Sequence, residues 1–574
     1  MSKYNIETVH PHVMPDLSDW PVYNLSEDRR QFIEDLEENT LEEILENPTD
    51  KVSEIISETM YLERIRIKEE PWKVDPPNEK QFWRRIKKSL VKDSLDQPRE
   101  KAAKNNEELL RQIIHRYSEE IVGTFRISTF LFARRFLTFF FNRLFQAKQR
   151  GFFRYGGARR RLYEKINVYG EVEKLRELFK KGSIVVVPTH HSNLDSIMIG
   201  YALDAVVGIP SFSYGAGLNL YNSGYAAYFM NRIGAYRVDR RKKNPIYLKV
   251  LKINSRLLIE RGVNSIFFPG GTRSRSGALE DKVKLGLVGT TIEAQRNLLQ
   301  SGSDKKVFIF PLILSYPFVL EGAQLINQHL KKSGKERYIE EKDNSYKPFK
   351  VLQFIWKILA EGTEITLSIG QPMDVMGNPV DINGDSFDKY GNQLDIADYF
   401  KLNGKVNKNR QREQQYTTEL GNAIVDRYFK DNIVLSSHLV AFAAFNLLKK
   451  ENPRLDLYGI LRLPEEDYRF SETNLHCVTG QILERLREMT SEGEIKLSKI
   501  LEQEETDTII RDGIKQLGAF HVVKPLRLKK GKILSDSFQL LYFYHNRLEH
   551  YGLDKAFQIS PAQLLKADLA LQED

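Results

Sequence analysis

Short apolar runs alternate with longer amphipathic segments through the middle of the chain. The runs are rich in β-branched and aromatic residues and cover 183–189, 264–270, 306–316 and 364–370. Segments between them, such as 244–262, place apolar residues three or four positions apart, as helices do. This rhythm is typical of α/β domains, in which helices cover a sheet of buried strands. We therefore predict an α/β domain with a central mixed sheet over residues 161–415.

Helical spacing dominates on both sides of this domain. Residues 32–47 repeat apolar positions at helical intervals, within an N-terminal region rich in Glu, Lys and Arg. A polar stretch at 373–415 is interpreted as a long surface excursion. Beyond it, helical spacing returns at 417–429, 436–450 and 479–493. We predict a helical N-terminal region over residues 1–160 and a mainly helical C-terminal domain over 416–574.

The most apolar stretch, 121–145, contains four arginines, at positions 126, 134, 135 and 143. At about 100° per residue they fall all round a helix, so the stretch is a poor spanning helix without a clean apolar face. Long arginine side chains can snorkel from an aromatic-rich helix among lipid headgroups, and five more arginines follow between 150 and 161. We expect contact with an anionic membrane surface. The alternative is a helix packed on the protein, with its arginines paired to acidic neighbours.

Composition narrows the range of partners. The formal net charge is +9 and the isoelectric point is about 9.1, which favours an anionic membrane, an acidic carrier protein, a phosphorylated substrate or nucleic acid. The sequence has no recognisable nucleic-acid module and no phosphate-binding loop of the Gly-Lys-Ser/Thr type. The run Gly215–Leu220 lacks the last glycine of a dinucleotide fingerprint. A small phosphorylated substrate, an anionic membrane surface and an acidic carrier protein therefore remain as expected partners.

Cys477 is the single cysteine, which excludes an internal disulfide and any multi-cysteine metal site. We expect no metal ion and no cofactor. The first 20 residues lack the basic start and apolar run of a secretory signal. We therefore expect a cytoplasmic protein that binds the cytoplasmic face of a membrane as a peripheral or monotopic protein.

The candidate for chemistry is a pair of residues directly after the first predicted strand. His190 and Asp195 have four residues between them and stand where a buried strand gives way to a helix. A neutral imidazole can take a proton from an attacking hydroxyl, while a carboxylate bonded to its other nitrogen fixes the tautomer. When the hydroxyl belongs to the substrate, no enzyme serine is needed. We interpret Ser192 and Asn193 as helix-capping residues, and His191 as solvated or packed.

Two basic segments follow. Residues 234–241 are predicted to form a short strand, whose alternation would send Arg240 to one side and Arg237 and Arg241 to the other. At most a subset of these arginines can therefore bind one phosphate. Further along, a glycine-rich turn lets the backbone approach an anion, and Arg273 offers a planar fork to phosphate oxygens.

Four blocks now stand in order along the chain: His190–Asp195, Gly234–Arg240, Phe268–Ser274 and the strand that contains Pro311. This order resembles the four-block pattern of the glycerophospholipid acyltransferase family, and auxiliary runs at 215–220 and 283–287 are similar as well. The resemblance covers about residues 160–375. In the C-terminal part, runs 436–448 and 540–553 resemble the tail of the larger glycerol-3-phosphate acyltransferases and their dihydroxyacetone-phosphate relatives.

The resemblance implies His190 as general base and Asp195 as its orienter. It implies substrate-binding roles for Arg240, Gly271, Arg273, Ser274, Lys284 and Pro311. Among these, the two arginines and Gly271 would contact the acceptor phosphate, Lys284 would assist them, and Pro311 would shape the acyl side of the pocket. Backbone N–H groups near the start of the following helix are expected to stabilise the oxyanion.

One position departs from the family pattern. The third block usually reads Phe-Pro-Glu-Gly-Thr-Arg-Ser, whereas this chain has Gly270 where the glutamate belongs. The catalytic pair is intact, so the departure concerns the acceptor pocket and its polar network.

The function implied by the resemblance is a glycerol-3-phosphate 1-O-acyltransferase, which catalyses the first step of phospholipid synthesis. It would move a fatty acyl group from acyl-CoA or acyl carrier protein to glycerol 3-phosphate and release lysophosphatidic acid. Acylation of lysophosphatidic acid or dihydroxyacetone phosphate by the same chemistry is an alternative. A catalytically silent membrane-binding protein is a third hypothesis, suggested by Gly270 and by the basic aromatic segment at 121–161.

Overall fold

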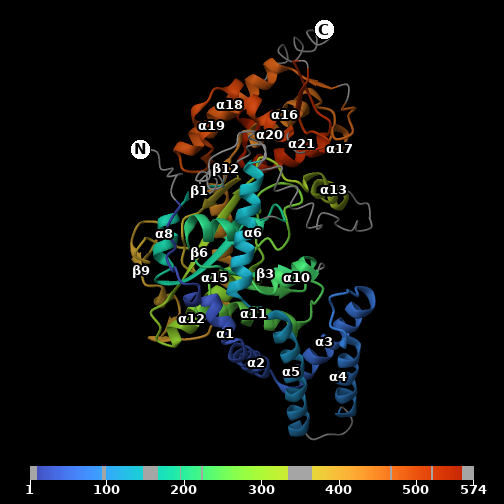
Figure 1. Cartoon of the computed structure of the whole chain (residues 1–574), viewed down its shortest axis with the longest axis vertical. Helices are drawn as coiled ribbons and strands as arrows, with labels where there is room; N and C mark the ends of the chain where they lie inside the picture. The colour runs from blue at the N-terminus through green and yellow to red at the C-terminus, as the bar shows by residue number, and fades with distance from the viewer. Residues whose placement is uncertain are drawn as a thin grey trace.

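The computed structural model of the chain describes residues 9–93, 99–146, 166–193, 195–221, 224–333, 365–465, 468–518, 521–529 and 531–558. The arginines between 150 and 161 that enter the membrane prediction lie outside these residues. Figure 1 shows the sheet in the middle of an elongated molecule, with N-terminal helices at one end and C-terminal helices at the other.

The central sheet has seven strands. Their bounds are β1 Ile166–Gly170, β2 Gly182–Pro188, β3 Ser213–Gly217, β4 Ala235–Val238, β5 Ser265–Ile266, β6 Lys306–Ser315 and β7 Ile365–Ile369. They lie in the order β1-β7-β6-β2-β5-β3-β4. Strands β2 to β6 are parallel, whereas β7 is antiparallel to β6 and pairs in parallel with β1. The predicted α/β fold with a mixed sheet is confirmed.

Helices cover both faces of this sheet. Those that follow its strands are α8 Val172–Leu178, α9 Asp195–Ala202, α10 Gly224–Met230, α11 Pro245–Glu260, α12 Leu285–Gln300, α13 Gly322–Ser333 and α15 Arg410–Lys430. Along β2, Ile184 and Val186 face the core that contains α9, while Val185 and Val187 face the core that contains α12 and α15. Burial of both faces explains why β2 is a continuous apolar run. The expected boundary between residues 415 and 416 falls inside α15.

The polar stretch after β7 is tied to the sheet in several places. It contains the short hairpins β8–β9 (Ser386–Phe387 and Gln393–Leu394) and β10–β11 (Lys401–Leu402 and Lys405–Val406). Met373, Val375 and Phe400 are nevertheless buried in the core with α12 and α15. The stretch is therefore more than a surface excursion, because several of its apolar residues are buried in this core.

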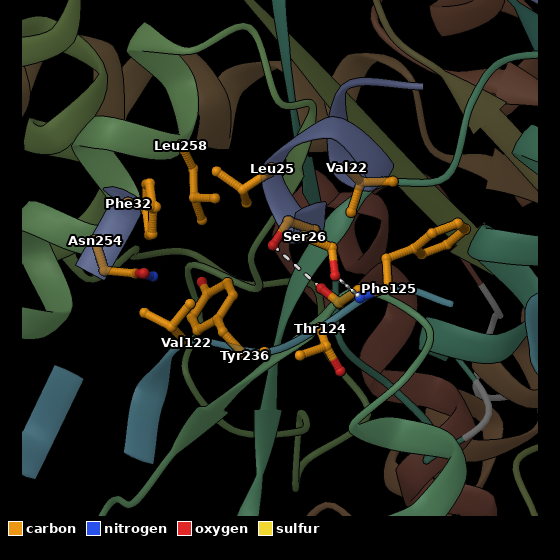
Figure 2. Close-up of a pocket in the computed structure, with 13 residues that line it drawn as sticks. Val22, Leu25, Ser26, Phe32, Val122, Thr124, Phe125, Tyr236, Asn254 and Leu258 are labelled. Atoms are coloured by element: carbon orange, nitrogen blue, oxygen red, sulfur yellow. Dashed lines mark hydrogen bonds between the residues drawn. The ribbon is translucent and has the colours of Figure 1, made fainter. Parts of the chain in front are cut away.

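The N-terminal helices are packed on one edge of the sheet. They are α1 Pro21–Glu27, α2 Arg29–Leu45, α3 Thr49–Glu69, α4 Glu79–Asp93, α5 Arg99–Ile121 and α6 Ile127–Gln146. Phe32 and Tyr117 share a core with Tyr236 of β4 and Tyr247 of α11. In Figure 2 the side chains of α1, α2 and residues 122–125 surround a small, mostly apolar pocket beside β4 and α11. The N-terminal region is thus continuous with the α/β domain in its packing.

The C-terminal part is mainly helical, as predicted from its spacing. Its helices are α16 Ser436–Glu451, α17 Leu457–Ile460, α18 Glu472–Ser491, α19 Lys499–Gln503, α20 Thr506–Gly518 and α21 Phe538–His545, followed by a 3-10 helix, η6, at Asn546–Tyr551. Strand β12 (Ile433–Val434) pairs with β14 (Lys496–Leu497), and β13, β15 and β16 form a small sheet. Helix α16 is buried along most of its length, and its apolar residues join the core that contains α9.

Helix α6 contains most of the apolar segment that was predicted to meet a membrane. Within the described residues, no helix is both long and apolar enough to cross a bilayer. One side of α6 packs on the protein, where Leu137 joins the core and Arg134 pairs with the buried Asp204 at 3.2 Å. The other side exposes Phe132, Phe136 and Phe139, by 56%, 43% and 63%. One side of α6 is thus packed on the protein with an arginine paired to an acidic residue, as in the alternative prediction. The other side leaves aromatic residues exposed to solvent.

Candidate active site

The predicted catalytic pair lies in a tight loop between β2 and α9. Nδ1 of His190 is 2.8 Å from Oδ2 of Asp195, the first residue of α9. Asp195 is fully buried, while the side chain of His190 is 16% exposed. No group of the described residues hydrogen-bonds to Nε2 of His190. The imidazole is thus held at one nitrogen, and a substrate hydroxyl could approach the other.

The carboxylate of Asp195 accepts four hydrogen bonds. Besides His190, its Oδ2 accepts the backbone N–H groups of His191 and Ser192, at 2.7 and 2.9 Å. Its Oδ1 accepts the phenol of Tyr316, directly after β6, at 2.8 Å. Burial raises the pKa of Tyr316 well above its usual range, so the phenol keeps its proton and donates it. These bonds fix the carboxylate, which in turn fixes the tautomer and the plane of the His190 ring.

His191 is packed and takes no part in the pair. Its ring is buried, and the guanidinium of Arg547, in η6, donates to its Nε2 at 2.6 Å. Burial and the nearby guanidinium hold the pKa of His191 well below its usual range, so the ring is neutral. Arg547 also donates to the carbonyl of Leu314 and the side chain of Asn432. Burial lowers the pKa of Arg547 to about 10, so it remains charged at neutral pH.

A second buried carboxylate, Glu321, holds the far side of the loop. It accepts the hydroxyl of Ser192 and the backbone N–H of Asn193, both at 3.2 Å. The guanidinium of Arg273 reaches the same carboxylate at 3.4 Å. Arg273 is therefore brought to the catalytic loop, as the resemblance implied, but in an ion pair. The hydroxyl of Ser192 donates to Glu321, and its carbonyl accepts the N–H of Asp195 at the start of α9.

The third block lies against the catalytic loop. The ring of Phe268 is 4.3 Å from that of His190, and the backbone N–H of Ser274 donates to the carbonyl of His190 at 2.7 Å. The hydroxyl of Ser274 donates to Ala278, within its own turn. Gly271 has a φ of +77°, and a Cβ there would lie 2.6 Å from Nζ of Lys284. Glycine is thus required at 271, and Lys284 covers the turn.

The arginines of the second block lie farther away. Strand β4 ends at Val238, so the alternation predicted through Arg241 does not hold, because residues 239–242 form a turn. Arg241 is bound to Asp239 and Asp75, and Arg240 is exposed. Three strand spacings separate β4 from β2, or about 14 Å. Arg240 can meet a phosphate near His190 only if its side chain reaches across the ends of β5 and β3.

Pro311 lies inside β6, the strand that was predicted to contain it. It is buried and pairs in register with Val187 of β2. On the other side, Leu312 pairs with Ile369 and Ile309 with Met373, so β6 has one residue fewer than its partner between these pairs. Proline is tolerated at such a bulge because the ladder is already interrupted there.

The backbone N–H groups expected to stabilise an oxyanion already have acceptors. The N–H of His190 donates to Glu280, those of His191 and Ser192 donate to Asp195, and that of Asn193 donates to Glu321. Within the described part of this loop, the amides therefore hold carboxylates instead of facing a substrate. Among the described residues, no group of three His, Cys, Asp or Glu side chains is placed to hold a metal ion.

Comparison with known proteins gives a consistent result. Residues 165–315 match the family model described as Acyltransferase. The glycerol-3-phosphate acyltransferase of Aeromonas hydrophila subsp. hydrophila is 30% identical over 225 residues, which are 39% of this chain and 24% of that protein. That of Shewanella loihica is 29% identical over 268 residues, which are 46% of this chain and 29% of that protein. The chain thus spans less than a third of the length of these curated relatives.

The mixed sheet, with a histidine–aspartate pair where β2 meets α9, and the family match define an acyltransferase domain. This part of the chain is similar to the glycerol-3-phosphate acyltransferases. The resemblance inferred from the sequence is confirmed for this part of the chain.

Four residues that hold the catalytic loop were missed by the sequence analysis. Tyr316 is the last residue of a predicted strand, and Arg547 lies in the run 540–553 that resembled the family's tail. The sequence patterns therefore included both residues but indicated no role for them. Glu280 and Glu321 lie outside any motif. Only their burial beside the loop distinguishes them from the other acidic residues of the chain.

Proposed function

We propose that this protein is a glycerol-3-phosphate 1-O-acyltransferase that takes a fatty acyl group from a thioester. The observation that carries the proposal is the 2.8 Å hydrogen bond between Nδ1 of His190 and the buried carboxylate of Asp195, inside an acyltransferase domain. Support for this acceptor comes from the relatives, which are named glycerol-3-phosphate acyltransferases.

In the proposed reaction, the sn-1 hydroxyl of glycerol 3-phosphate lies at Nε2 of His190. Its oxygen attacks the carbonyl carbon of the thioester while its proton passes to Nε2, and Asp195 stabilises the imidazolium through Nδ1. The tetrahedral intermediate then breaks its C–S bond, and the imidazolium gives the proton to the departing thiolate. The acyl group passes directly to the acceptor because the substrate supplies the nucleophile.

The acceptor phosphate is proposed to lie over the third block, near Gly271 and Lys284, with Arg273 and Ser274 at the edge of the catalytic loop. Because Arg273 is paired with Glu321 at 3.4 Å, a bound phosphate would compete with that carboxylate for the guanidinium. Arg240 is proposed to reach in from the second block. Pro311 is buried below this edge and is proposed to shape the acyl side only through the backbone of β6.

Peripheral contact with the cytoplasmic face of an anionic membrane is proposed to bring the enzyme to its lipid product. Phe132, Phe136 and Phe139 follow at i, i+4 and i+7 on α6 and are all exposed. Phe132 stacks on Phe229 of α10, next to the half-exposed Tyr228. An exposed aromatic face of this kind suits insertion among headgroups.

The donor is proposed to be acyl-CoA or acyl carrier protein, and no other cofactor is needed for the reaction. Lysophosphatidic acid or dihydroxyacetone phosphate as acceptor would keep the same role for His190 and is the second candidate. The third is a silent membrane-binding protein, for which the exposed aromatic face of α6 alone would be functional.

The test combines chemistry, acceptor and donor. Purified protein in mixed micelles receives labelled glycerol 3-phosphate with palmitoyl-CoA or palmitoyl carrier protein. We expect lysophosphatidic acid from the wild type and a loss of about 10²- to 10⁴-fold in His190→Ala. His476→Ala, at an exposed histidine of α18, is the matched control and should keep its rate. Product only with another acceptor would move the enzyme to a neighbouring step, and no transfer with any pair would refute the acyltransferase proposal.

Membrane binding is tested separately by flotation with anionic vesicles. We expect the triple variant Phe132→Ser, Phe136→Ser and Phe139→Ser to lose vesicle binding. Tyr390→Ser, at a 79% exposed aromatic in the β8–β9 hairpin, is the control for a lost surface ring. Unchanged flotation of the triple variant would refute α6 as the contact.

A further inference from the structure

The space beside Gly270 is filled by the carboxyl group of a residue ten positions further along. A Cβ added at Gly270 would lie 3.1 Å from Cγ and 3.2 Å from Oε1 of Glu280. The two arms of the loop are held together nearby, where the backbone N–H of Lys284 donates to the carbonyl of Pro269 at 2.8 Å. Glu280 therefore projects its side chain into the place where a side chain at position 270 would begin.

From there Glu280 reaches the backbone of the catalytic histidine. Its Oε1 accepts the N–H of His190 at 2.8 Å. On the other side of the same residue, the carbonyl of His190 accepts the N–H of Ser274. Both polar groups of the His190 backbone are thus bound to the loop that contains Ser274 and Glu280. The ring is bound separately, to Asp195. An unmet backbone donor at this point would be costly, because the site is largely shielded from water.

We propose that Glu280 is a positioning residue, which supplies from a second position the carboxyl group that the family pattern places at 270. Glycine at 270 and glutamate at 280 form a matched exchange, in which the glycine makes room for the new carboxyl group. Glu280 contacts the backbone of His190. It acts by fixing the position of this backbone, and with it the position of the imidazole ring relative to Asp195. The inference rests on the proposed function, because the ring is assigned there as the general base.

Other features agree with this assignment. Oε2 of Glu280 is buried and accepts no hydrogen bond from the described residues, while Oε1 accepts the His190 amide, the first of the two backbone donors that hold the carboxyl group. Gly270 does not have a positive φ, so its backbone suits any residue and glycine is not needed there for conformation. By contrast, Gly271 has a φ of +77° and needs glycine for its backbone. Space for Glu280 is therefore the reason that remains for a glycine at 270.

The test removes the carboxyl group from position 280 and then restores one at position 270. Glu280→Ala should lower kcat by about 10- to 100-fold and leave the KM for the acyl donor within about threefold, because the base is misplaced while binding is kept. Glu280→Gln should stay within about threefold of the wild type, since an amide oxygen can also accept the His190 N–H. Gly270→Glu alone should be at least as impaired as Glu280→Ala, because it forces two carboxyl groups into one space. The double variant Gly270→Glu/Glu280→Ala should recover most of the lost kcat.

The matched control is Glu260→Ala on α11. Glu260 is also a partly buried glutamate whose pKa is raised by burial, but its partners lie on α11 and α12. Its loss should leave kcat unchanged, and thermal unfolding of every variant shows whether a lost rate reflects lost folding. Full activity of a folded Glu280→Ala would overturn the inference. So would a folded double variant no better than Glu280→Ala, or a Glu280→Gln as impaired as Glu280→Ala.

A second readout needs no turnover. The rate at which diethylpyrocarbonate modifies His190, followed by mass spectrometry of its peptide, reports how firmly the ring is held. We expect modification to become several-fold faster in Glu280→Ala and to return toward the wild-type rate in the double variant. If the wild type transfers no acyl group, the proposed function fails, and this order of modification rates still decides for or against the hold of Glu280 on His190.

Discussion

The two helical regions hold different loops at the same edge of the sheet, and they do so with opposite charges. The N-terminal helices supply carboxylates to the loop after β4: Asp75 binds Arg241, Glu120 binds Lys242 and Glu63 binds Asn244. The C-terminal part supplies a cation to the loop after β2, where Arg547 binds His191.

This difference indicates a division of labour. Asp75 and Glu120 bind Arg241 and Lys242, directly after the second block, so the N-terminal helices fix the loop that the proposed function assigns to the acceptor phosphate. Arg547 is bound to His191, next to the proposed base, so in the proposed reaction the C-terminal part would help to place His190. We therefore expect changes on the N-terminal side to raise the KM for the acceptor, and changes on the C-terminal side to lower kcat.

The largest effect is expected from Arg547→Ala. It removes a buried cation that donates to His191, Leu314, Ser315 and Asn432 and leaves a cavity behind the catalytic loop. We expect kcat to fall about 100-fold and the free energy of unfolding to fall by about 3–5 kcal/mol. Steady-state kinetics and urea denaturation measure both. Arg454→Ala, at an exposed arginine of the same part, should change neither, and an active Arg547→Ala would break the comparison.

Arg241→Ala tests the N-terminal side. The variant removes the cation that Asp239 and Asp75 share, so the loop after β4 is no longer fixed. The two carboxylates left behind would repel an anionic acceptor. We expect the KM for glycerol 3-phosphate to rise about tenfold, with kcat within about threefold. Arg261→Ala is the control, because Arg261 also pairs with N-terminal carboxylates, those of Asp28 and Asp35, at the far end of α11. A fall in kcat with an unchanged KM would contradict the division of labour.

Tyr316→Phe tests whether a hydrogen bond from the end of β6 to Asp195 contributes to placing the proposed base. It removes the donor to Oδ1 of Asp195, while Oδ2 keeps its three hydrogen bonds. We expect kcat to fall about fivefold, less than in Arg547→Ala, and stability to fall by about 1–2 kcal/mol. Tyr428→Phe removes another buried hydroxyl, bonded to the carbonyl of Val187, and should lower stability without changing kcat. Equal kcat effects in the two variants would remove any special role for Tyr316.

The last prediction concerns the pH dependence of stability, through the titration of Glu280, and expects little change in activity. Burial raises the pKa of Glu280 to about 7, from an ordinary 4.5. The folded protein therefore binds this proton more tightly than the unfolded chain, and the group lowers stability as pH rises through that window. Glu280→Gln lacks this titration, so its stability should gain on the wild type by about 2–3 kcal/mol between these pH values. Urea denaturation across the window measures the difference, and a constant difference would refute the raised pKa.

Much of the fold could be predicted because its signals are local. The runs at 183–189 and 306–316 are apolar through their centres, and both correspond to strands buried on two faces. The run at 264–270 was harder, since only Ser265–Ile266 pairs as a strand and the rest forms the loop over the active site. The bulge beside Pro311 could not be predicted, because it depends on the pairing of β6 with β7 and the residues after it, which come much later in the chain.

By itself the sequence determined the element order and the short contact between His190 and Asp195, because five positions across a strand-turn-helix junction allow few geometries. Only the tertiary structure decided what holds that pair. Tyr316 reaches Asp195 across 121 positions and Arg547 reaches His191 across 356. Glu280 reaches His190 across 90. No periodic pattern encodes such partners, since they are chosen by how sheet, loop and helices pack, and by the need of each buried polar group for a partner.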